Sequence, residues 1–208
     1  MLEPLTLFLL GFAVGLSGAV IPGPFTAFTV FDTARKQRIT GPLIVAGHIV
    51  WEFLIIVIIL LGFGWLISST RLYIYLTGGA VLVLMGANMV RSDHSASQMQ
   101  RARTGSSFLG GIFYTAVNPT QPVWWATAGL ALLLQGMDIM GVVGVAAVTA
   151  GHWSSDFAYY TLVSYLVKSQ ERYVSRHQRA IALALGAFIA ILGASFIAQG
   201  FGWLVLYG

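Results

Sequence analysis

Two histidine–acid pairs are the residues of this sequence with the clearest potential for chemistry. His48 precedes Glu52 by four residues, and His152 precedes Asp156 by the same interval. Residues four apart on a helix lie on one face, so each imidazole is expected beside its own carboxyl. Such a pair can exchange protons, line a solute pathway, or simply satisfy itself inside a rigid core. The residues leave these interpretations open, and we favour proton exchange.

Both pairs lie within long apolar stretches. The 208-residue chain is 57% hydrophobic and 9% charged, whereas soluble domains contain roughly one-quarter charged residues. Apolar runs long enough to cross a bilayer predict six transmembrane helices, at 5–31, 42–67, 72–90, 108–134, 139–167 and 180–206. Glu52 and Asp156 then lie near mid-membrane, where an ionised carboxyl is costly and usually has a function.

The basic residues predict the orientation of these helices. Ten of the eleven lysines and arginines follow the first, third and fifth predicted spans, and only Arg71 falls on the other side. By the positive-inside rule, these three loops are cytoplasmic and both termini lie outside. The net charge of +4 therefore reflects membrane topology, and we expect no nucleic-acid partner.

Two motifs recur in the same order and indicate an internal duplication. Residues 47–53 and 151–157 both read Gly-His-x-x-x-acid-Phe, and proline clusters occur at 22–24 and 118–122. A three-span unit inverts when it is duplicated, so we predict an all-α membrane fold of two inverted three-helix repeats. The repeats are residues 1–91 and 108–208, joined by a cytoplasmic linker at 92–107. Chance similarity between apolar segments is the less favoured alternative.

The proline clusters predict that the first and fourth helices are broken inside the membrane. Proline removes a backbone donor and clashes with the preceding turn, which frees backbone groups that can bind a solute. A static kink is the alternative. Tryptophan faces near the second break can hold an ammonium group, although for any one tryptophan we favour packing. The substrate-binding candidates are Pro22, Gly23, Pro24, Asn118, Pro119, Trp124 and Trp125, and the proton-coupling candidates are His48, Glu52, His152 and Asp156.

The motif set resembles the LysE family of amino-acid exporters. The likeness rests on Pro-Gly-Pro at 22–24, Asn-Pro-Thr-Gln-Pro-Val-Trp-Trp at 118–125 and Gly-His-Trp-Ser-Ser-Asp at 151–156, and it extends over nearly the whole chain. It implies proton-driven efflux of amino acids or related small solutes across the plasma membrane of a prokaryote. The family pattern supports the proline motifs, Asn118 and Asp156, whereas His48, Glu52 and His152 rest mainly on the repeat.

We therefore expect a proton-coupled secondary exporter of an amino-acid-like solute. The alternative is a divalent metal-ion exporter, which requires the two histidine–acid pairs to meet in space. A purely structural membrane component would leave the buried acids without a purpose. An enzyme is not expected, since the chain has no cysteine, nucleophile motif, zinc-protease pattern or cofactor fingerprint, and the favoured interpretation assigns no cofactor and no metal. The expected partners are the solute, protons and lipid, and a homo-oligomer is left open.

Overall fold

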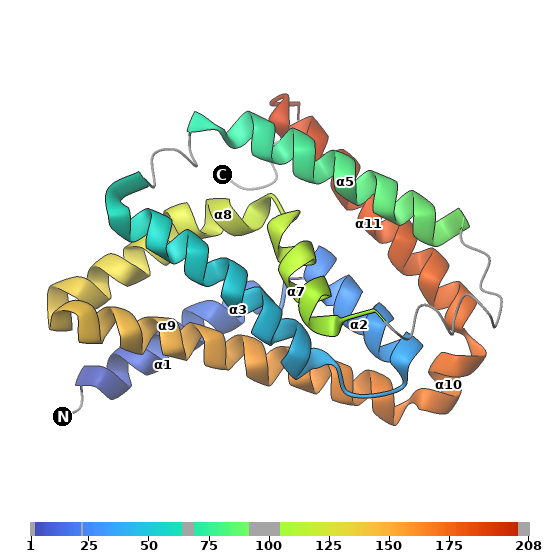
Figure 1. Cartoon of the computed structure of the whole chain (residues 1–208), viewed down its shortest axis with the longest axis horizontal. Coiled ribbons are helices and arrows are strands. Elements are labelled where there is room, and N and C mark those ends of the chain that lie inside the picture. Colours follow the sequence, from blue (N-terminus) through green and yellow to red (C-terminus); the bar gives the residue numbers. More distant parts are fainter. Residues whose placement is uncertain (1–2, 22, 64–68, 92–104, 204–208) are drawn as a thin grey trace.

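The computed structural model describes residues 3–21, 23–63, 69–91 and 105–203, and every regular element within these ranges is a helix. Pro22 and most of the predicted linker at 92–107 lie outside the described residues. The described helices form an elongated bundle (Figure 1). They are α1 Glu3–Ala19, α2 Pro24–Lys36, α3 Gly41–Ile58, η1 Ile59–Phe63, α5 Arg71–Arg91, α7 Ser107–Ala116, α8 Thr120–Trp124, η2 Trp125–Gly129, α9 Leu130–Ser169, α10 Glu171–Arg176 and α11 Gln178–Gly200.

Three helical segments are long and apolar enough to cross a membrane, namely Gly41–Gly62, Thr120–Ser169 and Arg179–Gly200. The pair α1 and α2 adds a fourth if it is one broken span, because the two helices are bent by 78° where they meet. Two shorter apolar helices, Leu72–Asn88 and Ser107–Ala116, complete the set found in the described part of the chain. The predicted class, an all-helical multi-pass membrane protein, is confirmed by these features.

The longest of these segments doubles back on itself. Within α9, Met140 (φ −139°) and Gly141 (φ 59°) leave the helical region, and glycine tolerates the positive φ that the turn requires. The two arms meet so closely that a Cβ on Gly144 would overlap the carbonyl oxygen of Gly136. The predicted spans 108–134 and 139–167 leave residues 135–138 for this turn. In the structure the helix continues to Met140, because the turn is made by Gly141 rather than by the polar residues before it.

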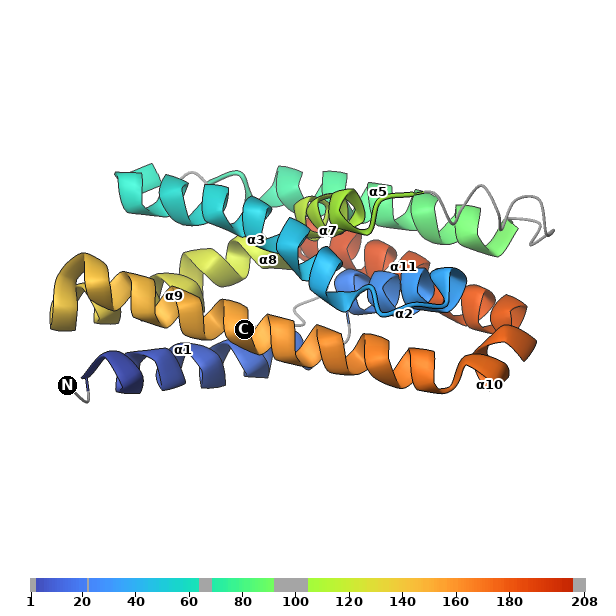
Figure 2. The ribbon, with the colours of Figure 1, turned by 60° about the horizontal axis from the view of Figure 1, so that its bottom comes forward.

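Glycines allow the central helices to approach closely. A Cβ on Gly11 of α1 would overlap the backbone of Val148 in α9, and a Cβ on Gly111 of α7 would overlap the backbone of Ile44 in α3. Small residues at such positions let helix backbones pack together inside a membrane. As a result α1 runs beside the second arm of α9, which is the part of that helix after Gly141. In the same way α7 runs beside α3 (Figures 1 and 2). These four helices enclose the residues of the candidate site.

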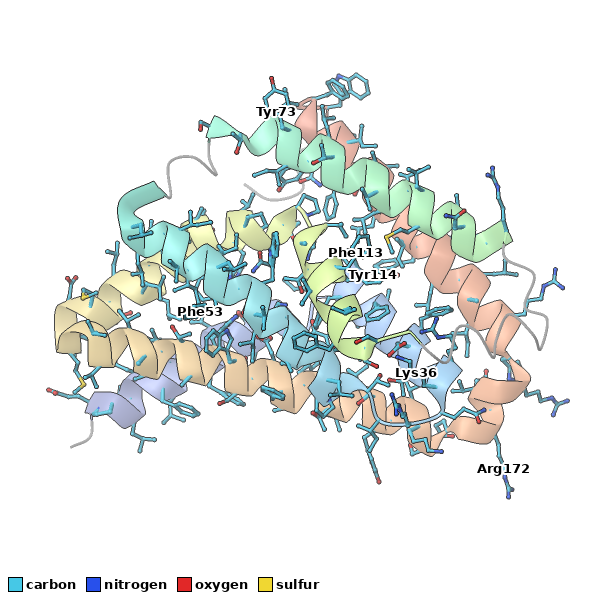
Figure 3. The ribbon with its side chains drawn as sticks, viewed as in Figure 1. Lys36, Phe53, Tyr73, Phe113, Tyr114 and Arg172 are labelled. Atoms are coloured by element: carbon cyan, nitrogen blue, oxygen red, sulfur yellow. The ribbon has the colours of Figure 1, made fainter. Side chains whose placement is uncertain are left out.

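Basic segments gather at one end of the bundle. Lys36 and Arg172 lie at the same end (Figure 3). The last turn of α2, the last turn of α5 and the short helix α10 all lie at the end with Lys36 (Figure 1). The charge asymmetry seen along the sequence is therefore also an asymmetry between the two ends of the molecule.

Candidate functional site

The two histidine–acid pairs come together between α3 and α9. Nε2 of His48 lies 3.2 Å from Oε1 of Glu52 and 3.6 Å from Oδ2 of Asp156. Nε2 of His152 lies 3.3 Å from Oε2 of Glu52 and 3.5 Å from Oδ2 of Asp156. Each imidazole thus contacts the acid on its own helix and the acid on the other helix. We call these four residues the His–acid cluster.

The His–acid cluster is almost fully buried. Glu52 is 2% exposed, Asp156 is 3% exposed, and the two histidines are 5% and 9% exposed. Removing a charge from water costs several kcal/mol unless another charge or several hydrogen bonds compensate it. Two carboxylates in this space therefore require positive charge close by. Protons on both imidazoles would make the cluster neutral.

Glu52 is surrounded by hydrogen-bond donors. Trp125 Nε1 donates to Oε1 at 2.7 Å, Trp153 Nε1 donates to Oε2 at 3.0 Å, and the amide of Gln121 donates to Oε1 at 3.2 Å. An indole nitrogen can only donate, so both carboxyl oxygens of Glu52 must act as acceptors. An ionised carboxylate meets this requirement without needing any reorientation, and its hydrogen bonds are the stronger kind.

A hydroxyl group fixes the orientation of one imidazole. Thr115 Oγ1 donates its proton to the carbonyl oxygen of Gly111 at 2.7 Å. Its 2.8 Å contact with Nδ1 of His48 must then be one in which the hydroxyl accepts, so Nδ1 of His48 bears a hydrogen. Nε2 of a neutral His48 would consequently point a lone pair at two carboxylate oxygens. That arrangement needs a cation at Nε2, either a proton or a metal ion.

Aromatic rings line the rest of the cluster. Trp124 stacks on His152 with ring centroids 4.9 Å apart, and Trp125 meets the same imidazole edge-on at 5.1 Å. Phe25 lies 4.7 Å from the His48 ring. These rings exclude water from around the ionisable groups, which strengthens electrostatic interactions within the cluster. The electron-rich face of Trp124 also stabilises a positive imidazole.

Three buried polar atoms at the cluster have no hydrogen-bond partner among the described residues. They are Oδ2 of Asp156, Nδ1 of His152 and Oε1 of Gln121. Buried polar atoms in folded proteins normally form hydrogen bonds, so these three atoms leave the cluster able to receive a ligand, a proton or water.

The first helix break adjoins the cluster. α1 ends at Ala19 and α2 begins at Pro24, with Gly23 in an extended conformation (φ −150°, ψ −176°) as its N-cap. Pro24 occupies the first turn, where a missing backbone donor costs nothing. The next residue, Phe25, contacts His48. Pro22, the other proline of this motif, lies outside the described residues.

The second break, in the second half of the chain, also adjoins the cluster. α7 ends at Ala116 and α8 begins at Thr120, after Asn118 and the buried Pro119. Oδ1 of Asn118 accepts hydrogen bonds from the backbone nitrogen of Thr120 at 3.2 Å and from its hydroxyl at 2.8 Å. The Asn118 side chain thereby holds the new helix start in place. Gln121, one residue further on, reaches Glu52.

A second buried carboxyl group was missed in the sequence. Asp32 is fully buried near the end of α2, where it pairs with Arg35 at 2.8 Å and with Lys36 at 3.0 Å. It also accepts a hydrogen bond at 2.7 Å from Ser107, the first residue of α7. The only local signal was the spacing of Asp32 three and four residues before two basic residues, which is also common on solvated helix ends. The contact with Ser107 joins the two halves of the chain.

A buried group of ionisable residues between two interrupted helices of an apolar bundle is typical of membrane transporters, in which broken helices flank the binding site. A family model described as LysE type translocator matches residues 16–200, and the chain belongs to this family. The resemblance found in the sequence is thereby confirmed, and with it the class of membrane exporter of small solutes rather than enzyme. Comparisons with curated proteins and with solved structures gave no match.

Proposed function

We propose that this chain exports a small amino-acid-like solute from the cytoplasm and that the His–acid cluster couples export to protons. The observation that supports this most directly is the meeting of two imidazoles and two carboxyls, all buried, beside both helix breaks. Family membership supplies the direction and the general kind of solute. The presence of two imidazoles and two carboxyls in the cluster is the reason for proposing that protons drive export.

Charge balance explains how a proton and a solute would exchange. The cluster is neutral when both imidazoles are protonated, because two positive charges offset the carboxylates of Glu52 and Asp156. Loss of one proton leaves a net negative charge in a buried space, which is unfavourable. The ammonium group of an amino-acid-like solute would restore neutrality, held over the face of Trp124. A proton and an ammonium group therefore exclude one another, as an exchanger requires.

The first break suits the other end of such a solute. α2 is 13 residues long and begins beside the cluster, with its first backbone N–H groups facing the break at Gly23. A helix N-terminus attracts negative charge. A solute carboxylate placed there would lie near Pro24, while its ammonium group lies near the acids. Asn118 and Pro119 fix the opposite break, and Trp124 and Trp125 form the aromatic wall.

Paired contacts between the halves support the inverted repeat. The contact between Gly11 and Val148 has a counterpart between Gly111 and Ile44. The glycines are 100 positions apart (111 − 11), and their partners are 104 positions apart (148 − 44). The same shift of 104 relates His48 to His152 and Glu52 to Asp156. A pseudo-twofold axis in the membrane plane accounts for these pairs, with repeats at 1–91 and 108–208.

Six crossings follow from this assignment. α1 with α2, α3 with η1, and α5 form the first repeat. The segment from α7 to the turn at Met140, the second arm of α9, and α11 form the second. The end bearing Lys36 and Arg172 would face the cytoplasm, which places both termini outside a prokaryotic plasma membrane.

Inverted membrane vesicles test the proposal. Labelled amino acids should accumulate in vesicles containing the wild-type chain when a pH gradient is imposed, because export in the cell becomes uptake in this orientation. Glu52→Gln and Asp156→Asn should abolish the gradient-dependent part, whereas Asp138→Asn, which changes an exposed carboxyl, should retain it. Uptake that depends on the gradient equally in all variants would contradict the coupling role.

A second candidate function, export of a divalent metal ion, is favoured by one observation. One ligand atom from each member of the His–acid cluster can be chosen so that all four lie within 4.8 Å of one another. The same vesicles distinguish the two cargoes, since radioactive zinc or manganese can replace the amino acid. Uptake of metal without uptake of any amino acid would favour this second candidate.

A further inference from the structure

The His–acid cluster has the spacing of a transition-metal site. With Oε1 as the ligand atom of Glu52 and Oδ2 as that of Asp156, the four contacts to the histidine Nε2 atoms measure 3.2, 3.4, 3.5 and 3.6 Å. Ligand atoms around a tetrahedral ion with bonds of about 2.0–2.1 Å are separated by about 3.3–3.4 Å. The longest separation between ligand atoms of the cluster is within 4.8 Å. The widest pair of ligand atoms would therefore have to close by at most about 1.4 Å to complete the coordination.

The hydrogen bond of Thr115 prepares His48 to bind a cation. Because Nδ1 of His48 donates to the Thr115 hydroxyl, the neutral imidazole has its lone pair on Nε2, which faces Glu52 and Asp156. Metal-binding histidines commonly donate the other ring N–H to an oxygen in this way, which fixes the tautomer and the ring orientation. Without a cation, this lone pair and two carboxylate oxygens would repel one another.

Asp156 supplies an independent indication of a missing ligand. Its side chain is buried, its Oδ2 atom has no hydrogen-bond partner, and that atom faces both imidazoles. Neutral imidazoles and two carboxylates leave a net charge of −2, which one divalent ion would cancel. Two nitrogens and two oxygens suit zinc, cobalt, nickel or copper better than magnesium or calcium, which prefer oxygen ligands alone.

We propose that the His–acid cluster binds one divalent transition-metal ion through Nε2 of His48 and His152 and one oxygen each of Glu52 and Asp156. Metal binding at the cluster is an equilibrium property of the chain and does not depend on which solute is exported. Because the ion would occupy the place of the protons, saturating metal is expected to stop proton-coupled exchange through the same cluster.

Cobalt(II) titration of the purified full chain tests this inference. The chain should be purified with a tag free of histidine, and its visible absorption should report cobalt bound by four ligands. We expect one ion per chain and loss of binding in His152→Gln and Asp156→Asn. Two matched controls, His177→Gln and Asp138→Asn, change a histidine and an acid outside the cluster and should bind as the wild type does.

Thr115 offers a variant that leaves all four ligands in place. Thr115→Val removes the acceptor for Nδ1 of His48 and should weaken cobalt binding about 10- to 100-fold, as loss of such an outer contact does in other metal sites. Thr115→Ser retains the hydroxyl and should bind cobalt as tightly as the wild type. A purely structural role for the hydroxyl would change stability without this difference in affinity.

Two results would overturn the inference: a wild-type chain that binds no cobalt, or binding that persists equally in His152→Gln and Asp156→Asn. The outcome is separable from that of the export proposal. Gradient-driven uptake of amino acids measured with a chelator present tests export alone. A chain that transports under those conditions and binds no cobalt refutes the metal site only, and a chain that binds cobalt without transporting refutes export only.

Discussion

The hydrogen bond from Trp125 to Glu52 permits a quantitative test of the buried cluster. Both side chains are buried, with Trp125 at 0% and Glu52 at 2% exposure, and the indole nitrogen lies 2.7 Å from Oε1. Hydrogen bonds to a charged group contribute about 1.5–3 kcal/mol to stability. Trp125→Phe removes the donor and Glu52→Leu removes the acceptor. We expect a coupling free energy of about 1.5–3 kcal/mol between these substitutions.

A double-mutant cycle isolates this coupling from the other consequences of each substitution. Trp125→Phe alone also leaves a cavity, and Glu52→Leu alone also leaves the indole of Trp153 and the amide of Gln121 without their acceptor. Those costs occur in both the single and the double variants, so they cancel in the cycle. The measurement is the free energy of unfolding in mixed micelles, obtained by titrating a denaturing detergent.

Trp203 provides a control for the double-mutant cycle. Trp203 is 75% exposed and stacks on Phe201, so Trp203→Phe should change stability little and show no coupling to Glu52→Leu. If the effects of Trp125→Phe and Glu52→Leu add to within about 0.5 kcal/mol, the two side chains do not share a buried hydrogen bond. The account of Glu52 as a carboxylate held by indole donors would then be wrong.

Three further predictions concern stability and topology. Asp32→Asn leaves the buried ammonium of Lys36 without its counter-ion and should lower stability by about 3–5 kcal/mol in thermal denaturation, while Asp138→Asn should have little effect. Gly111→Ala should greatly reduce the yield of folded protein because its methyl group would overlap the backbone of α3. In Gly18→Ala the new Cβ would lie 3.5 Å from its nearest neighbour, Nε1 of Trp124, so this variant should fold normally. The chain contains no cysteine, so Asp138→Cys should react with an impermeant maleimide on intact cells, while Arg172→Cys should react only after permeabilisation; the reverse pattern would invert the proposed orientation.

The sequence predicted more of the fold than of the contacts within it. Long apolar runs, basic residues in alternate loops and proline clusters are local features, and they predicted a helical membrane protein broken at the proline clusters 22–24 and 118–122. In the structure the helices begin again at Pro24 and Thr120. The boundaries were less accurate where a glycine rather than a polar residue makes the turn, as at Gly141. Helix α2 also extends to Lys36, five residues beyond the predicted end at position 31, because the basic residues continue the helix beyond its apolar part.

The sequence by itself determined which residues are neighbours within one helix. The four-residue spacing of His48 and Glu52, and of His152 and Asp156, fixes each pair because helical periodicity is a local property of the chain. Only the tertiary structure decided that the two pairs share one site and that Trp125 donates to Glu52. Those contacts depend on how closely, and in which register, the glycine-lined helices pack, and residues about a hundred positions apart come into contact only through that packing.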